Sequence, residues 1–186
     1  MNKGGINRCA WVNLKNPLYV KYHDEEWGRR PKSDSLLYEL FILETFQAGL
    51  SWECVLNKRE AIRAAFDGFD PKKVAAYNAQ DVERLMATEG IIRNRAKLTA
   101  AISNTQVYLA LCHEFGSFEH YIKTFVGLES IVEPYTERTT SPSSDALSKD
   151  MKRRGMKFVG STTIYSFLQA AGFIEAHGLE CDIRAK

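Results

Sequence analysis

The spacing of apolar residues constrains the fold of this chain more than any other feature. Apolar residues recur three and four positions apart along nearly the whole sequence, and no stretch alternates apolar and polar residues as a half-buried strand would. We therefore expect an all-α fold, mostly or wholly helical. At 186 residues the chain suits one hydrophobic core, so we expect a single domain over residues 1–186 with room for two lobes.

Capping residues divide this pattern into helices. Ser33 or Asp34 can cap an amphipathic helix that ends near Gly49, and Ser51 can cap a second helix that runs to about Phe66. Further helices are expected in the following places: from Pro71, from about Gln80 to Thr88, through Leu98 to Cys112, over Ser117–Val126, from Ser144 to about Arg154, and from Ser161 to about Ala171, with a loop over 133–144.

Composition limits the partners and the compartment. The formal net charge of +2 is nearly neutral, so binding to a polyanion would need a local basic patch rather than a global field. No apolar run is long enough to span a bilayer, and no hydrophobic leader follows Met1, so we expect a cytoplasmic protein without membrane contact. The four cysteines are widely scattered, which favours reduced thiols or metal ligands over a disulfide framework.

Glu44 stands where a core residue is expected. It lies four positions after Leu40 and seven after Leu37, so helical spacing places its carboxylate on the apolar face. One interpretation is that Glu44 reaches water, or backbone amides, at the end of its helix. The other is a functional bend that combines a carboxylate, a wedge and an aromatic platform. The residues that follow and would form this bend are Gln47, Gly49, Leu50, Ser51 and Trp52.

Four aromatic residues crowd the N-terminal region, where no clear amphipathic helix is present to bury them: Trp11, Tyr19, Tyr22 and Trp27. They can be ordinary core residues. They can equally line a pocket for a planar ligand, because such rings stack on a flat molecule while their polar atoms still form hydrogen bonds.

A glycine turn separates two of the expected helices. It comprises Glu89, Gly90, Ile91, Ile92 and Arg93. Unpaired amides at the start of the following helix, with Arg93, Arg95 and Lys97 nearby, would suit a phosphate group. An ordinary helix hairpin with a solvated basic side remains the alternative.

Cysteine and histidine residues occur near both ends of the chain. Cys9 and His23 lie near the start, and His177 and Cys181 lie four apart near the end. Two cysteines and two histidines suit a closed tetrahedral zinc site. The wide spacing of the first pair is unlike a compact zinc finger, so by spacing alone a coincidence remains open.

Five sequence motifs, in order along the chain, resemble those of the 3-methyladenine DNA glycosylase I family. The resemblance extends from Cys9 to Cys181, which is nearly the whole chain, and the motifs together are highly specific. They are Cys9-Ala10-Trp11-Val12, Tyr22-His23-Asp24-Glu25-Glu26-Trp27-Gly28, Gln47-Ala48-Gly49-Leu50-Ser51-Trp52, Ser144-Asp145-Ala146-Leu147-Ser148-Lys149 and Lys157-Phe158-Val159-Gly160.

The resemblance implies an all-α, two-lobed helix-hairpin-helix glycosylase with the hairpin over about residues 80–114. It implies that the turn seats a DNA phosphate through Gly90, Ile91, Ile92 and Arg93. It also implies a zinc ion that links the two chain ends. The implied zinc ligands are Cys9, His23, His177 and Cys181. With four protein ligands and no open position, such zinc is structural.

The resemblance further implies a monomeric, monofunctional enzyme that extrudes 3-methyladenine from alkylated double-stranded DNA, hydrolyses its N-glycosidic bond and so initiates base excision repair. Glu44 is then the catalytic pocket carboxylate and Trp52 the stacking platform. The other implied base-binding residues are Tyr22, Trp11, Trp27 and Tyr19, and the implied DNA-binding residues of the bend are Gln47, Gly49 and Leu50. The alternatives are a non-catalytic helix-hairpin-helix DNA-binding protein and a glycosylase with a different alkylated-purine preference.

Overall fold

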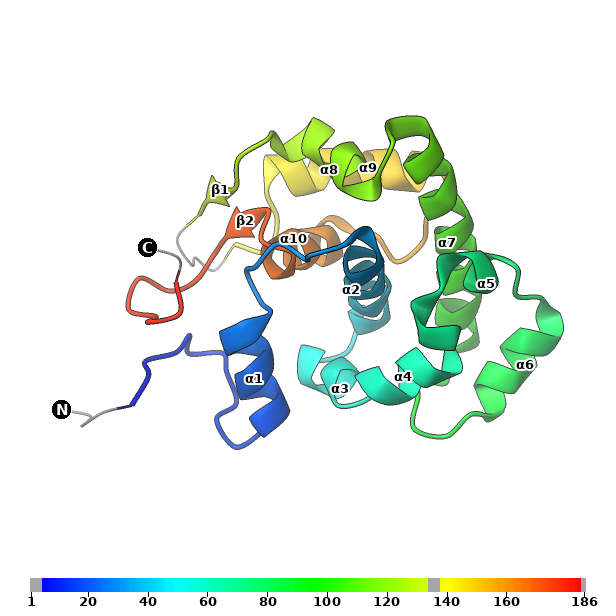
Figure 1. Ribbon diagram of the computed structural model, residues 1–186, viewed down its shortest axis with the longest axis horizontal. Helices are drawn as coiled ribbons and strands as arrows, with labels where there is room; N and C mark the ends of the chain where they lie inside the picture. The colour runs from blue at the N-terminus through cyan, green and yellow to red at the C-terminus, as the bar shows by residue number, and fades with distance from the viewer. Residues whose placement is uncertain (1–4, 134–137, 185–186) are drawn as a thin grey trace.

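The computed structural model describes residues 5–133 and 138–184 and is mostly helical (Figure 1). None of the described helices combines the length and apolar character that a membrane-spanning segment needs. The helices, in chain order, are α1 (Pro17–Glu25), α2 (Asp34–Gln47), α3 (Trp52–Leu56), α4 (Arg59–Ala65), the 3-10 helix η1 (Asp67–Phe69), α5 (Pro71–Ala75), α6 (Ala79–Ala87), α7 (Arg95–Phe115), α8 (Phe118–Val126), α9 (Pro142–Arg153) and α10 (Ser161–Ala170).

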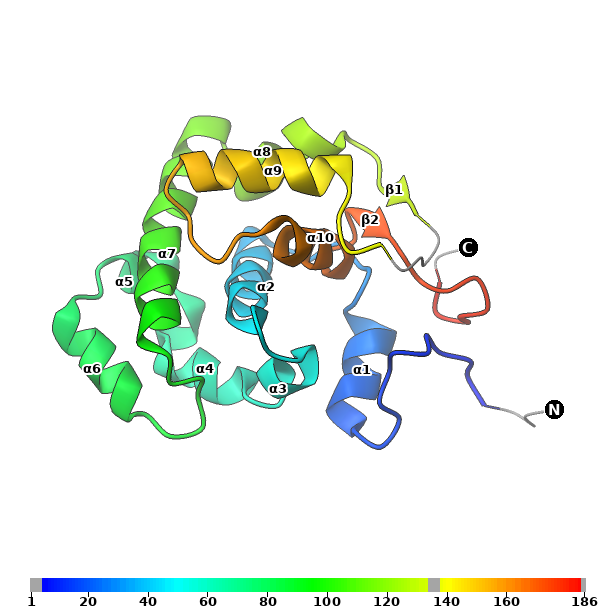
Figure 2. The same ribbon diagram turned by 180° about the vertical axis from the view of Figure 1, so that it is seen from behind.

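Helix α2 lies at the centre of the molecule, and α3, α7, α8 and α10 pack around it (Figures 1 and 2). Ser33 caps α2, as expected, by accepting a hydrogen bond from the amide of Leu36. Every residue over 37–46 is buried, including two glutamates. The expectation of an amphipathic helix was therefore wrong: α2 is buried around its whole circumference, as befits the helix that other helices enclose.

The helix expected from Ser51 to about Phe66 is broken into α3 and α4. Asn57 ends α3, and α4 starts two residues later. The break allows Arg59 and Arg63 to reach Glu39 of α2, whose Oε1 lies 2.7 Å from Arg59 Nε and 2.6 Å from Arg63 Nη2. Since Glu39 is buried, these contacts satisfy a carboxylate that would otherwise be costly to desolvate, and they hold α4 against the central helix.

Helix α1 was not expected from the apolar pattern, because it buries only Tyr22 and His23. Its signal is instead the Asn16–Pro17 pair. Asn16 is the N-cap and accepts a hydrogen bond of 3.1 Å from the amide of Leu18, and Pro17 occupies the first helical position.

Two short strands depart from a wholly helical fold. Strands β1 (Ile131–Val132) and β2 (Ile174–Glu175) pair in parallel and join the segment after α8 to the segment after α10. Helix α9 begins at Pro142 with a capping box at Ser141, earlier than the expected start at Ser144. Of the loop expected over 133–144, residues 134–137 lie outside the described residues.

A buried asparagine connects α7 to the loop between α9 and α10. The side chain of Asn104 accepts a hydrogen bond of 2.8 Å from the amide of Lys157 and donates one of 2.9 Å to its carbonyl. Asn104 is fully buried, so its amide group depends on these hydrogen bonds to satisfy its donor and its acceptor.

We expect Asn104→Ala to lower the free energy of unfolding by about 1–3 kcal/mol, because it removes two hydrogen bonds and leaves a cavity where a fully buried side chain was. Urea denaturation measures this loss. Gln106→Ala is the matched control, since Gln106 is an exposed amide on the same helix that donates one bond to a backbone carbonyl, and its loss should stay within about 0.5 kcal/mol. Equal losses in the two variants would contradict the role assigned to Asn104.

Candidate functional site

A cavity of about 200 Å³ opens beside the C-terminal half of α2, between α1, α3 and α10. Apolar cavities of about 150 Å³ admit benzene, so this one has room for a planar ring system. The residues that line it are Trp11, Tyr19, Tyr22, Trp27, Glu44, Gln47, Trp52, Ser166 and Gln169. All the residues assigned from sequence to base binding, together with Glu44 and Gln47, are therefore brought to one cavity.

Sequence reasoning missed Ser166 and Gln169. They lie three positions apart on α10, so they share one face of that helix. The available signal was two polar residues at helical spacing within a largely apolar helix.

Glu44 is the most unusual group in the cavity. Its side chain is 2% exposed, and its Oε2 atom has no hydrogen-bond partner among the described residues. Burial raises the pKa of Glu44 to about 8, because the interior disfavours the charged carboxylate. The structure therefore rejects the interpretation in which Glu44 reaches water at its helix end.

The walls of the cavity are two groups of aromatic rings. The Trp11 ring lies 4.9 Å from that of Trp27 and 5.4 Å from that of Tyr19, measured between centroids. On the other side, the Tyr22 and Trp52 rings lie 5.1 Å apart and are tilted by 43°. A flat ligand in this cavity would thus meet aromatic rings from α1, α3 and the N-terminal segment.

Trp52 adds an unpaired donor to the unpaired acceptor of Glu44. Ser51 caps α3 by accepting from the amide of Cys54, which places Trp52 in the first turn and against the cavity. Its Nε1 is buried and has no partner within the described part of the chain. Native interiors leave few such groups, so two in one cavity favour a ligand with both hydrogen-bond donors and acceptors.

The turn over residues 47–50 joins α2 to α3 at the edge of the cavity. The amide of Leu50 donates to the carbonyl of Gln47 at 2.6 Å, and Ala48 and Gly49 have the dihedrals of a type II turn. Gly49 has φ of +75°, which a type II turn requires at this position and which disfavours other residues. Leu50 is 39% exposed, so the turn presents an apolar side chain to solvent.

Helices α6 and α7 form a helix–turn–helix around the predicted phosphate seat. Gly90 has φ of +80°, and a Cβ there would lie 3.2 Å from that of Ala61 in α4, so the turn packs closely on α4. Within residues 5–133 and 138–184, the amides of Ile92 and Arg93 have no hydrogen-bond acceptor. The Arg93 side chain is exposed, whereas Ile91 is buried and offers only its backbone.

Of the two other basic residues near this turn, one is exposed in an ion pair and one is buried. Arg95 forms an ion pair with Glu83 of α6, with Nη2 and Oε2 2.8 Å apart. Lys97 is buried and donates to carbonyls at the end of α2, so it cannot belong to a solvent-facing phosphate seat.

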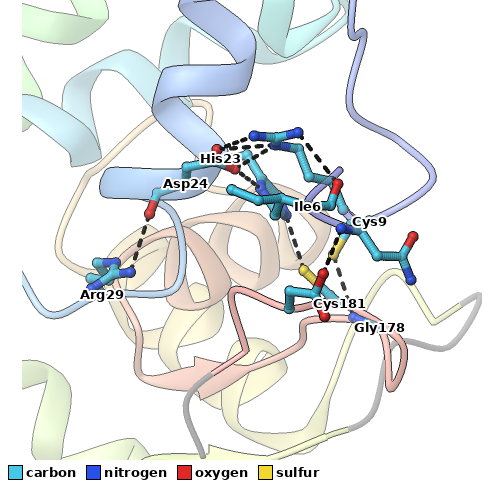
Figure 3. Close-up of polar contacts among 10 residues, drawn as sticks. Ile6, Cys9, His23, Asp24, Arg29, Gly178 and Cys181 are labelled. Atoms are coloured by element: carbon cyan, nitrogen blue, oxygen red, sulfur yellow. Dashed lines mark hydrogen bonds and ion pairs between the residues drawn. The ribbon is translucent and has the colours of Figure 1, made fainter. Parts of the chain in front are cut away.

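Three of the four predicted zinc ligands meet at the junction of the two chain ends (Figure 3). The ligand atoms of Cys9, His23 and Cys181 lie within 4.8 Å of one another, and all three residues are buried. His23 directs its Nε2 toward Cys181 Sγ, 3.6 Å away, because its Nδ1 is held by Asp24 at 2.8 Å. Arg8 in turn holds the Asp24 carboxylate with hydrogen bonds of 2.6 to 3.0 Å.

His177, the fourth predicted ligand, lies beside this group without joining it. Its ring centroid is 5.4 Å from that of His23, and its Nδ1 lies 2.7 Å from Glu175 Oε1. Its Nε2 is buried and has no partner among the residues described. An orphaned imidazole nitrogen next to two thiols and a second imidazole is a donor set that fits a tetrahedral metal ion.

Hydrogen bonds around the junction also suit metal ligands. Each histidine has its second nitrogen on a carboxylate, an arrangement that orients metal-ligating imidazoles. The amide of Gly178 points at Cys9 Sγ, 3.4 Å away. Burial raises the pKa of Cys9 to about 11, and a bound cation would oppose this shift because it favours the thiolate.

Comparison with known proteins shows similarity to methyladenine glycosylases over nearly the whole chain. The family model for methyladenine glycosylase matches residues 11–185. The DNA-3-methyladenine glycosylase 1 of Escherichia coli (strain K12) is 46% identical over 180 residues, which cover 95% of this chain and 96% of that protein. The DNA-3-methyladenine glycosylase of Haemophilus influenzae is 43% identical over 180 residues, which cover 94% of this chain and 96% of that protein.

Solved structures agree with the sequence relatives. A crystal structure of 3-methyladenine DNA glycosylase I superposes with a TM-score of 0.91 at 44% identity, covering 96% of this chain and all of the other. A structure of 3-methyladenine recognition by the Staphylococcus aureus enzyme gives a TM-score of 0.92 at 38% identity, covering 98% of this chain and 99% of that one.

Because the Glu44 carboxylate is buried without a partner for its Oε2, we expect the free energy of unfolding to depend on pH. The pKa of Glu44 is about 8 in the folded protein and near 4.5 when exposed, so the folded state holds the proton more tightly. The stability contributed by protonated Glu44 is fully present below about pH 4.5 and is lost as the pH rises through about 8. Relative to Glu44→Gln, the wild-type chain should therefore lose on the order of a few kcal/mol of unfolding free energy across this range.

Urea denaturation of both proteins from about pH 5 to about pH 9 measures the difference. Glu60→Gln is the matched control, because Glu60 is an exposed glutamate on α4 and its substitution should leave the pH dependence unchanged. A constant difference between wild type and Glu44→Gln over this range would contradict the raised pKa.

Proposed function

The chain belongs to the methyladenine glycosylase family, and we propose that it excises 3-methyladenine from alkylated double-stranded DNA by hydrolysing the N-glycosidic bond. The single observation that carries this proposal is the position of Glu44, desolvated and unpaired in a cavity walled by aromatic rings. The relatives' names state the same activity.

Charge explains why this cavity suits the damaged base. Adenine methylated at N3 is cationic while attached to its sugar, and desolvated aromatic faces attract a cation by about 2 kcal/mol. Trp52 and Tyr22 supply such faces, with Trp11, Trp27 and Tyr19 around them. A cation beside Glu44 also opposes the desolvation that raises its pKa, so the base and the carboxylate favour each other's charged forms.

Hydrogen bonding explains selectivity for adenine. The Glu44 carboxylate can accept from the exocyclic amino group of adenine, whereas guanine presents an acceptor oxygen at the same place and is repelled. Trp52 Nε1 is a second buried group whose partner a base can supply, since a ring nitrogen accepts a hydrogen bond.

The turn after α2 and the α6–α7 hairpin provide contacts to DNA in this proposal. Leu50 and Gly49 fill the space that the extruded base leaves in the duplex, and Gln47 lies between them and the cavity. The hairpin turn seats a phosphate with the free amides of Ile92 and Arg93. Extruding a base costs a few kcal/mol, and least for a damaged base, so extrusion itself contributes to selectivity.

The cationic base is already a good leaving group, so the bond to the sugar needs little help from an acid. Water then attacks the sugar carbon and leaves an abasic site. The residues that line the cavity include no lysine that could form a Schiff base with the sugar. We therefore expect a monofunctional enzyme that leaves the strand intact.

The junction of the chain ends would hold a structural zinc ion through Cys9, His23, His177 and Cys181. The buried Nε2 of His177 supports this proposal, because it lacks any partner among the described residues and lies beside the other three ligands. The metal would supply a cross-link and no catalytic chemistry. Trp11 and Trp27 pack directly on His23 and His177, so this cross-link would steady one wall of the cavity.

We further propose that residues 1–186 act as one domain and as a monomer, with the helix-hairpin-helix over about 80–114. The observation that supports a single domain is that α2 packs against helices that precede, belong to and follow the hairpin, namely α3, α7, α8 and α10.

The purified protein should release free 3-methyladenine from methylated duplex DNA, detected by chromatography of the released bases. Glu44→Gln should lose most of this activity, because it removes the negative charge that the cationic base needs. Glu60→Gln is the matched control on the surface. Absence of base release at micromolar enzyme would refute the proposed activity, and release of a different alkylated purine in preference would change the substrate.

Native protein should contain about one zinc ion per chain, as measured by elemental analysis. Cys181→Ser and His177→Ala should each lower the zinc content and the thermal stability, because each removes one of four ligands. Cys112→Ser, which changes a cysteine of α7 outside the junction, is the control. Clearly substoichiometric metal in native protein would reject the four-ligand assignment.

A further inference from the structure

Lys97 is the buried lysine that neither the cavity nor the phosphate seat uses. It lies in the first turn of α7 and is 8% exposed, although the sequence around it is rich in basic residues. Its Nζ donates to the carbonyl of Phe46 at 2.8 Å and to that of Ala48 at 2.6 Å. Desolvation lowers its pKa, so this burial is costly and needs the compensating hydrogen bonds.

Those two carbonyls belong to the C-terminal end of α2, where helical carbonyls lack intrahelical partners. A cation there also interacts favourably with the negative end of the helix dipole. Ala48 is the second residue of the type II turn that presents Leu50, so Lys97 holds the turn directly by its backbone. In both ribbon views, this end of α2 and the start of α7 lie at the same side of the molecule (Figures 1 and 2).

The hairpin turn and α2 are joined by a second route. Gly90 packs on Ala61 of α4, and Lys58 donates to the Gly90 carbonyl at 3.4 Å. Helix α4 is in turn held to α2 by the ion pairs of Arg59 and Arg63 with Glu39. The hairpin, α4 and α2 therefore form one closed set of contacts. Among the residues that the structure describes, Lys97 supplies the hydrogen bonds that connect the hairpin to the turn over 47–50.

We propose that Lys97 is a positioning residue that couples the docked hairpin to the turn over 47–50, so that seating a phosphate on the hairpin places Leu50 in the duplex. This inference rests on the proposed function. Lys97 touches neither the base nor the DNA in this arrangement and acts only through the backbone of residues 46 and 48.

Lys97→Met removes the charge and both hydrogen bonds while keeping a long unbranched side chain. We expect the single-turnover rate of 3-methyladenine release from duplex DNA to fall roughly 10- to 100-fold, because misplacement by about 1 Å can cost this much. Binding of free 3-methyladenine, followed by tryptophan fluorescence, should be unchanged, because the free base needs the cavity and not the turn. Equal loss of free-base binding would overturn the proposal and indicate a general structural role.

A double-mutant cycle with Leu50→Ala tests the coupling itself. If Lys97 acts through Leu50, Lys97→Met should slow release by less than about threefold further once Leu50 is truncated. If Lys97→Met slows base release by the same factor in Leu50→Ala as in wild type, the proposal fails. This outcome differs from failure of the proposed function, in which the wild-type protein releases no base at all.

Two further variants serve as controls. Lys97→Arg keeps the charge but changes the geometry of the donors, so its rate should lie between those of Lys97→Met and wild type. Should Lys97→Met fail to fold, Lys97→Arg replaces it in the cycle with Leu50→Ala, with the same two outcomes. Lys123→Met removes a helical lysine of α8 that pairs with Glu119, at 2.8 Å, and should release base at the wild-type rate.

Discussion

The desolvation of Glu44 is the constraint on which the site depends. A carboxylate at this depth is costly, and the cost is not offset by a partner, since Oε2 has none within the described chain. The aromatic rings that line the cavity around Glu44 are the same rings that would hold a flat cation. The structure therefore carries an unfavourable interaction in the free protein that a cationic purine would relieve.

Glu44 is desolvated because α2 is buried on all sides. The helix carries Glu39 and Glu44 five positions apart, and the two buried carboxylates differ in their partners. Glu39 receives Arg59 and Arg63 from α4, whereas Glu44 faces only the cavity. The same helix thus provides a satisfied ion pair that supports packing and an unsatisfied carboxylate that supports binding.

The spacing of residues within one helix predicted side chains that face the interior. It did not predict features that depend on contacts with a second helix. Burial of Glu44 was expected from its four- and seven-residue spacing to Leu40 and Leu37. The same spacing did not predict that Glu39 is buried as well, because α2 is enclosed on every side. The break before Arg59 was not predicted, and the buried partner of Arg59, Glu39, lies on a different helix, where local spacing does not reveal it. The apolar pattern also overlooked α1, although the cap at Asn16 followed by Pro17 was visible in the sequence.

The grouping of Cys9, His23 and Cys181 has the same explanation. Spacing along the chain left Cys9 and Cys181 as a coincidence, because their meeting depends on contacts between the chain ends such as the hydrogen bond from the Asp182 amide to the Asn7 carbonyl. The family resemblance supplied the pairing that spacing could not. Even so, the structure groups three of the four predicted ligands, and the His177 ring lies beside them with its Nε2 unpaired among the described residues.

Lys97 and Glu44 are both buried, but they differ in whether their polar atoms have hydrogen-bond partners within the protein. Both are charged residue types in the interior, and both were visible in the sequence, where Lys97 looked like part of a solvated basic run. In the structure Lys97 has two carbonyl acceptors, so its charge is used internally. Glu44 lacks a partner for one of its oxygens. Natural proteins rarely leave buried polar atoms unpaired. The unpaired oxygen of Glu44 therefore indicates a ligand-binding site, whereas the hydrogen-bonded Lys97 indicates a residue that stabilises the structure around that site.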